Sequence, residues 1–130
     1  MNKRIEKMIP IAYTAVKQEL LNDKGGINKQ YNGYISSFGA SVIQSGMLLA
    51  LIFNHQKDAN TEMDRNKLMK VIYRVVRPDD PAEGSNLLIY YQSMEGDKRN
   101  QKQLKQSILD AATAIKLVIR TFHLTNDGDE

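Results

Sequence analysis

Residues 98–124, KRNQKQLKQSILDAATAIKLVIRTFHL, decide the fold class. At about 100° per residue, the apolar side chains of this stretch recur with the alternating four-and-three spacing of a helical packing seam. The seam consists of Leu104, Ile108, Ala111, Ile115, Val118 and Phe122. The spacing predicts one long helix that buries this seam against the rest of the chain.

A second row on the same predicted helix is entirely cationic and lies within about 60° of arc, on a different face from the seam. The row consists of Lys98, Lys102, Lys105, Lys116 and Arg120. It is about 33 Å long at a rise of 1.5 Å per residue. Asp110, the one acidic residue in the stretch 98–122, lies away from the row. The predicted helix therefore keeps its positive charge separate from its apolar surface.

Helical periodicity extends over most of the remaining chain and predicts further helices at about 3–21, 28–45, 47–56, 61–77 and 86–94. Pro10 is expected to kink the first of these or to end a short first turn. Residues 47–56 are apolar over most of their surface, so we expect them to form the buried centre. The sequence thus predicts an all-α, compact single-domain bundle of about six helices over residues 1–125, followed by a disordered acidic tail at 126–130.

Composition limits the possible classes of protein. The chain has 130 residues, of which 42% are apolar, which is enough for one globular core. It has no cysteine, which excludes disulfides, thiolate zinc sites and cysteine nucleophiles. The longest apolar run, residues 47–53, is too short to span a bilayer. We expect a cytoplasmic protein.

The predicted helix at 61–77 also separates its charges from its apolar residues. Lys67, Lys70, Arg74 and Arg77 share one side, and Leu68, Val71, Ile72, Val75 and Val76 share the other. Any single lysine is best explained as part of a solvated face. A whole row of one sign is costly, however, because each like-charge pair loses a few tenths of a kcal/mol, about the amount that a Glu–Lys pair would gain. Both rows therefore predict contact with a polyanion, and phosphate backbone would be bound in a salt-dependent, sequence-independent way.

Catalytic and metal-binding constellations are not found in the sequence. His55 and His123 lie on separate predicted helices, with no acidic cluster beside either in sequence. Gly25 and Gly26 lack the Gly-Lys-Ser/Thr ending of a phosphate-binding loop, and Asp79 with Asp80 is typical of a turn. We therefore expect no enzyme activity, no metal and no cofactor.

The predicted helix at 28–45 carries small residues on part of its surface. Gly33, Gly39 and Ala40 alternate with serines there, so another backbone could approach closely. Close packing inside the subunit is the favoured interpretation, and a contact with another subunit is the alternative.

The stretch at 31–56, YNGYISSFGASVIQSGMLLALIFNHQ, resembles the central signature of the small-subunit family of the type III-B CRISPR Cmr effector complex. The matching positions are Tyr31, Gly46, Met47, Ala50, Leu51 and Phe53. The last helix is similar to the family's final helix, with Asp110 ten residues before Arg120. The chain departs from the family where a Trp-Leu-Lys-Arg sequence is usual, because residues 117–120 are Leu-Val-Ile-Arg.

This resemblance implies a non-catalytic subunit whose copies stack in an inner filament, beside a backbone filament that holds the guide RNA. The implied partners are guide and target RNA, bound through their backbones, other copies of this chain, the large polymerase-like subunit and the backbone subunits. Base pairing would supply sequence specificity, as in other RNA-guided effectors. The nine cations of the two rows are the implied RNA-binding residues. No membrane partner is expected.

Two other functions remain open from the residues alone. The first is an all-α DNA-binding regulator, which would need a recognition helix suited to base edges. The acidic start of the predicted helix at 61–77, with Glu62 and Asp64, argues against it. The second is a structural protein–protein adaptor whose basic rows meet acidic protein surfaces.

Overall fold

The computed structural model describes residues 2–56, 64–79 and 85–126, and the following statements concern these ranges. They form six helices and two strands of two residues each, so the expected all-α class is confirmed. The helices are α1 (Lys3–Leu20), α2 (Lys29–Ser45), α3 (Met47–His55), α4 (Arg65–Val76), α5 (Leu87–Gln92) and α6 (Lys98–Ile119). The strands are β1 (Ile27–Asn28) and β2 (Leu124–Thr125).

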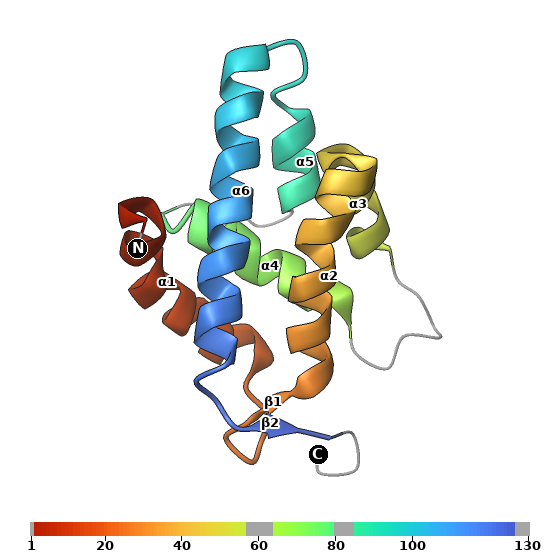
Figure 1. Ribbon diagram of the computed structural model, residues 1–130. Coiled ribbons are helices and arrows are strands. Elements are labelled where there is room, and N and C mark those ends of the chain that lie inside the picture. The colour runs from red at the N-terminus through yellow and green to blue at the C-terminus, as the bar shows by residue number, and fades with distance from the viewer. Residues whose placement is uncertain (1, 57–63, 80–84, 127–130) are drawn as a thin grey trace.

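The long helix α6 forms the front of the molecule, with α1 on one side and α2 on the other (Figure 1). Its N-cap is Asp97, whose carboxylate accepts a hydrogen bond from the backbone N–H of Asn100 and so satisfies one free donor of the first turn. The predicted seam is buried from Leu104 to Val118. Phe122 is only half-buried because the helix ends at Ile119, earlier than predicted.

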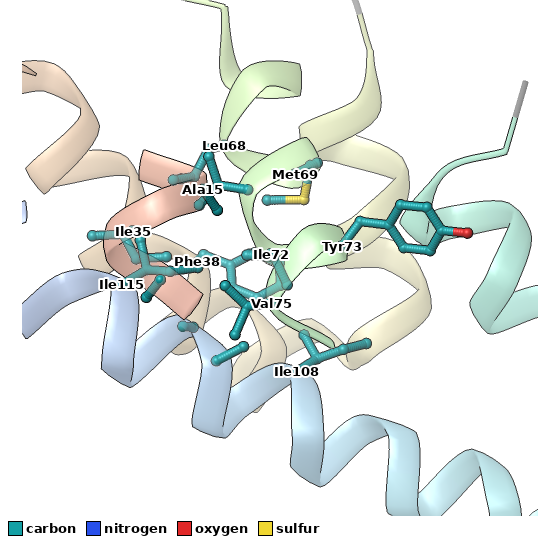
Figure 2. Packing of buried hydrophobic residues seen from close by; sticks show 14 of the residues in the cluster. Ala15, Ile35, Phe38, Leu68, Met69, Ile72, Tyr73, Val75, Ile108 and Ile115 are labelled. Carbon is teal, nitrogen blue, oxygen red and sulfur yellow. The ribbon is translucent and has the colours of Figure 1, made fainter. Parts of the chain in front are cut away.

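The centre of the fold is α4, which contacts each of the other five helices. It crosses behind α6 in Figure 1, and its side chains meet those of α1, α2 and α6 in the core shown in Figure 2. Six of its twelve residues are buried, on a single broad face. Its basic residues can still reach solvent because lysine and arginine carry their charge at the end of a long stem.

The expectation that residues 47–56 form the buried centre is wrong. The helix α3 lies at one side of the molecule, against α2, α4 and α5 (Figure 1). It buries Met47, Ala50, Leu51 and Asn54 and leaves large apolar side chains on its other face exposed. Its apolar composition therefore exceeds what its burial inside this subunit requires.

The sequence predicts either a kink or the end of a first turn at Pro10, and it predicts that a helix starts near residue 61. The helix α1 continues through Pro10, so proline does not end a first turn there. The helix α4 begins at Arg65, after its N-cap Asp64, whose side chain accepts a hydrogen bond from the backbone N–H of Asn66. The part of the predicted helix at 61–63 lies outside the described residues.

The sequence did not predict the two short strands, which pair the segment after α1 with the segment after α6. The strands β1 and β2 pair in parallel, with Ile27 opposite Leu124 and Asn28 opposite Thr125. The backbone N–H of Ile27 also donates to the carbonyl oxygen of His123 at 2.9 Å. The segment after α1 is thereby fastened to the segment after α6.

Gly26 stands at this junction and is expected to be intolerant of any side chain. A Cβ atom at Gly26 would lie 2.8 Å from the carbonyl oxygen of His123 and 2.8 Å from Cγ2 of Thr125. One of these atoms belongs to the paired backbone and cannot move alone. We predict that Gly26→Ala lowers the free energy of unfolding by about 1–3 kcal/mol, the usual cost of overpacking. Chemical denaturation with a circular-dichroism readout measures this change.

Gly33 offers the matched control, because a Cβ atom there meets nothing within 4 Å. Gly33→Ala should raise the free energy of unfolding by about 0.5–1 kcal/mol, since alanine costs less entropy inside a helix. If both variants change stability in the same direction, the account of the junction at Gly26 is refuted. The open space at Gly33 and Gly39 also shows that the expected close packing of this surface inside the subunit is wrong.

Candidate nucleic-acid interface

The basic row of α6 lies on the solvent-facing side of that helix. Lys98, Lys102, Lys105 and Arg120 are exposed, and Lys116 is half-buried. Among the described residues, none of these five cations lies within 4.0 Å of a carboxylate oxygen. Within these ranges, no carboxylate therefore compensates the positive charge of the row.

The row consists of two groups rather than one continuous line. Three lysines occupy the first part of α6, and Lys116 and Arg120 occupy its end. Eleven positions, about 16 Å of helix, separate Lys105 from Lys116. Between them, Ala112 is buried and Thr113 is exposed and uncharged. An extended polyanion would contact both groups and pass over a neutral stretch.

The first group of cations begins at the N-terminus of α6, where the helix dipole is itself positive. The first turn of α6 has no acidic residue after its cap, Asp97, and it contains Lys98 and Arg99. Cations near a helix N-terminus are destabilising by about 0.3–1 kcal/mol, whereas anions are stabilising there. A bound phosphate would therefore remove an unfavourable interaction at this end of α6.

Asp110 does not neutralise the row, because it points into the body of the protein. Asp110 is 5% exposed, and its carboxylate accepts a hydrogen bond from Nε of Arg4 at 2.8 Å. Nε2 of Gln106 donates to its other oxygen at 3.0 Å. The acid that the family resemblance singles out therefore fastens α1 to α6, and it lies apart from Arg120 at the end of that helix.

Two of the four cations in the basic row of α4 contact other side chains of the protein. Lys67 and Lys70 are exposed. Nε of Arg74, however, donates to Oε1 of Glu19 on α1 at 3.2 Å, and the guanidinium of Arg77 stacks 4.5 Å from the ring centre of Tyr90. The expectation of a single-signed face at this helix is corrected, since α1 places an acid beside it. The structure brings Lys70, Arg74 and Arg77 to the wall of one cavity, which Lys67 does not line.

An apolar surface that the sequence analysis missed lies on the outer side of α3. Leu49 is 59% exposed and Phe53 is 55% exposed, and Ile43 at the end of α2 reaches 84%. Phe53 and Tyr34 flank the guanidinium of Arg65, whose carbon lies 5.2 and 3.9 Å from the two ring centres. Residues 47–53 are apolar at every position, more than one buried face needs, and this pattern could have indicated the surface. Clusters of this kind on soluble proteins mark contacts with partners.

His55 ends α3 and is more than half-buried. Its Nδ1 lies 2.6 Å from the carbonyl oxygen of Leu51, and its buried Nε2 has no hydrogen-bond partner. Loss of solvent lowers the pKa of His55 below its ordinary value of 6.5, an effect that the hydrogen bond to Leu51 partly offsets. The imidazole is therefore neutral at pH 7.

The lowered pKa of His55 has a consequence for stability. Below about pH 6.5 the unfolded chain binds a proton at His55 before the folded chain does, so stability falls as the pH falls. We predict that the difference in melting temperature between the wild type and His55→Gln shrinks between pH 7.5 and pH 5.5. The exposed His123 gives the control variant, His123→Gln. A difference that stays constant across this range would contradict the prediction.

The described residues show no group of three His, Asp or Glu side chains that could hold a metal ion. None of the helices in the described ranges combines the length and apolarity needed to cross a membrane.

A comparison with protein-family models matches residues 5–122 to the family described as CRISPR-associated protein (Cas_Cmr5). No curated protein and no solved structure matches the chain. The family match extends from α1 to the segment after α6, and its range includes the signature residues noted in the sequence. The chain therefore belongs to the Cas_Cmr5 family and is a CRISPR-associated subunit of the Cmr type.

Proposed function

We propose that this protein is a non-catalytic small subunit of a type III-B Cmr effector complex that holds the backbone of guide and target RNA. The observation that carries the proposal is the exposed row on α6, which has no carboxylate partner among the described residues. Such a row attracts phosphate without distinguishing bases, so sequence specificity is left to base pairing between guide and target.

The apolar side of α3 supports the second half of the proposal, which is assembly with other protein subunits. Ile43, Leu49 and Phe53 would each lose exposed apolar surface in such a contact, and this burial is favourable by about 25 cal/mol per Å². The open, small-residue surface of α2 adjoins Ile43 on the same helix and would let a partner backbone come close. Both surfaces favour contact with another copy of this chain or with a backbone subunit.

A structural adaptor remains the alternative, because acidic protein surfaces could also cover the basic rows. The two functions differ in what an intact assembly contains. We expect that purification of the tagged full-length chain from its native cells yields Cmr subunits together with short guide-like RNAs, identified by mass spectrometry and RNA sequencing. Recovery of the protein partners without RNA, before and after nuclease treatment alike, would favour the adaptor.

A further inference from the structure

The exposed side of α2 carries apolar and small polar residues and, after its first residue, no charge. The helix lies on the opposite side of α6 from α1 (Figure 1). Ile43 is 84% exposed, the highest fraction among the large apolar side chains of the described residues. From Gln30 to Gln56 the chain has no Asp, Glu, Lys or Arg, although these types make up 25% of the whole sequence. This side of α2 therefore offers no charged group to a phosphate backbone or to a charged protein surface.

Four exposed positions of α2 form a row along this side of the helix. They are Gly33, Ser36, Ala40 and Ile43, here called the α2 seam. The intervals of three, four and three residues are those of helices that pack side by side, as in the buried row of α6. The helix buries a different face against the core, so the α2 seam is a packing face without a helix packed on it.

The spacing of the α2 seam is the same in both directions, which makes the seam complementary to itself. A second copy of α2 that lies antiparallel, centred on the middle of the seam, places Ile43 opposite the partner's Gly33. The same register places Ser36 opposite the partner's Ala40. A Cβ atom at Gly33 meets nothing within 4 Å, so the surface there is open for the isoleucine side chain. The largest residue of the seam thus meets the smallest, and each contact occurs twice.

Burial of the α2 seam leaves none of its polar side chains without a hydrogen-bond partner. The Ser36 hydroxyl donates to the carbonyl oxygen of Asn32 at 2.9 Å. The neighbouring Ser37 hydroxyl donates to the carbonyl oxygen of Tyr34 at 3.1 Å. The other members of the seam have no polar side-chain atoms. The cost of an unpaired buried donor, about 1–3 kcal/mol, is therefore avoided when a second helix covers this face.

The charges at the two ends of α2 also favour an antiparallel partner. Lys29 lies in the first turn, where the helix dipole is positive, and the last turn of α2 has no basic residue. In the antiparallel pair, Lys29 of each copy lies beside the last turn of the partner's α2, where a cation is stabilising. A parallel pair would place the two lysines side by side.

We infer that the free chain forms a two-fold pair with a second copy of itself through the α2 seam. The inference rests on the subunit-assembly half of the proposed function and chooses one of the two partners left open there. A two-fold contact uses the same surface on both copies and therefore closes, whereas a stack of copies needs two different surfaces. The pair is thus a state of the free subunit, and it buries Ile43 before the complex forms.

Sedimentation velocity of the full-length chain without RNA tests the pair. Between about 1 μM and 1 mM, a range that covers weak association, we expect the fraction of dimer to rise with concentration. Because the pair contains Ile43 twice, Ile43→Asp should weaken the dimer by about a hundredfold or more. Ile89→Asp is the matched control, since Ile89 is also exposed, at 49%, but lies on α5. A wild-type chain that stays monomeric, or equal effects of the two variants, would overturn the inference.

Disulfide cross-linking tests the antiparallel register, because the chain has no cysteine of its own. Ser36→Cys and Ala40→Cys are prepared separately, one of them with a tag, and are then mixed and oxidised. The antiparallel pair brings these two positions together, so the mixed disulfide should be the main product. Each variant alone should cross-link little, since equal positions are then about 6 Å apart along the helix axis. Abundant cross-links of each variant with itself would indicate a parallel contact and refute the register.

Two outcomes separate this inference from the proposed function. If the wild-type chain stays monomeric but Ile43→Asp is missing from complexes purified through another tagged subunit, a different kind of subunit covers the α2 seam. The pair is then refuted, and the proposed assembly stands. If Ile43→Asp abolishes the free dimer but enters these complexes at the wild-type ratio, the pair is supported as a state of the free subunit alone.

Discussion

Replacement of Lys102, Lys105, Lys116 and Arg120 with glutamate is expected to release target RNA from the assembled complex at moderate salt. Each cation that neutralises a phosphate of a single strand contributes about 0.7 to the slope of log K against log salt, so four contacts contribute roughly 2.8. Between about 50 and 200 mM salt, this slope corresponds to roughly a 50-fold change in affinity for each copy of the subunit. The four side chains carry this effect together, because none has a carboxylate partner among the described residues.

The fold should survive these four replacements. Lys102, Lys105 and Arg120 are exposed and Lys116 is half-buried, so the melting temperature should change little. Each replacement changes the charge by two units, which takes the net charge from +3 to −5. RNA retention is measured by filter binding or anisotropy of the purified complex over a range of salt concentrations.

A matched variant separates the effect of the α6 row from the effect of net charge. Lys7, Lys17, Lys24 and Lys29 are exposed and lie outside both basic rows. Their replacement with glutamate produces the same net charge on other surfaces. We expect the salt slope of this control to stay near that of the wild type. If both quadruple variants lose RNA equally, or if neither does, the α6 row is not the RNA-binding surface.

The helices could be predicted from the sequence because their signals are local. Apolar spacing near 3.6 residues and the breaks at Gly25, Gly46 and Pro78 determine where most helices begin and end. The strands β1 and β2 could not be predicted, because two residues carry no periodicity and their partners lie almost a hundred positions apart. A parallel pairing over that distance is decided by how α1 and α6 pack.

The position of each helix in the bundle was harder to predict than its existence. Apolar composition indicated α3 as the centre, but α4 occupies it while keeping one charged side. A helix is central when its buried face meets several neighbours, which depends on tertiary contacts rather than on the fraction of apolar residues. The apolar excess of α3 points instead to a partner outside the described chain.

In the candidate site, too, features that depend on tertiary contacts could not be predicted from the sequence. The α6 row was predictable because all its members belong to one helix and no acid shares their face. The pairing of Arg74 with Glu19 was not, because the two residues are 55 positions apart and meet only when α1 packs on α4. The cavity that Lys70, Arg74 and Arg77 line arises in the same way, because α1 supplies one of its walls and α4 supplies another.

Charge placed on the outer side of α3 is expected to keep the subunit out of the complex without unfolding it. Leu49→Asp with Phe53→Asp changes two exposed side chains, so the isolated chain should remain folded. In an interface each aspartate would be buried without a partner, and the contacts of a large apolar side chain would be lost. Central apolar contacts contribute about 2 kcal/mol each, which corresponds to roughly 30-fold in affinity per residue and close to a thousandfold for the pair.

Native mass spectrometry of complexes purified through another tagged subunit measures how many copies of the variant are present. Leu21→Asp is the control. Leu21 is an exposed apolar residue (41%), and it follows the end of α1, outside the apolar surface of α3. The loss of copies should appear even when RNA is removed from the complex, because the contact is between proteins. A double variant that enters the complex at the wild-type ratio would show that α3 faces solvent in the assembly. Its apolar surface would then have no role in subunit contact.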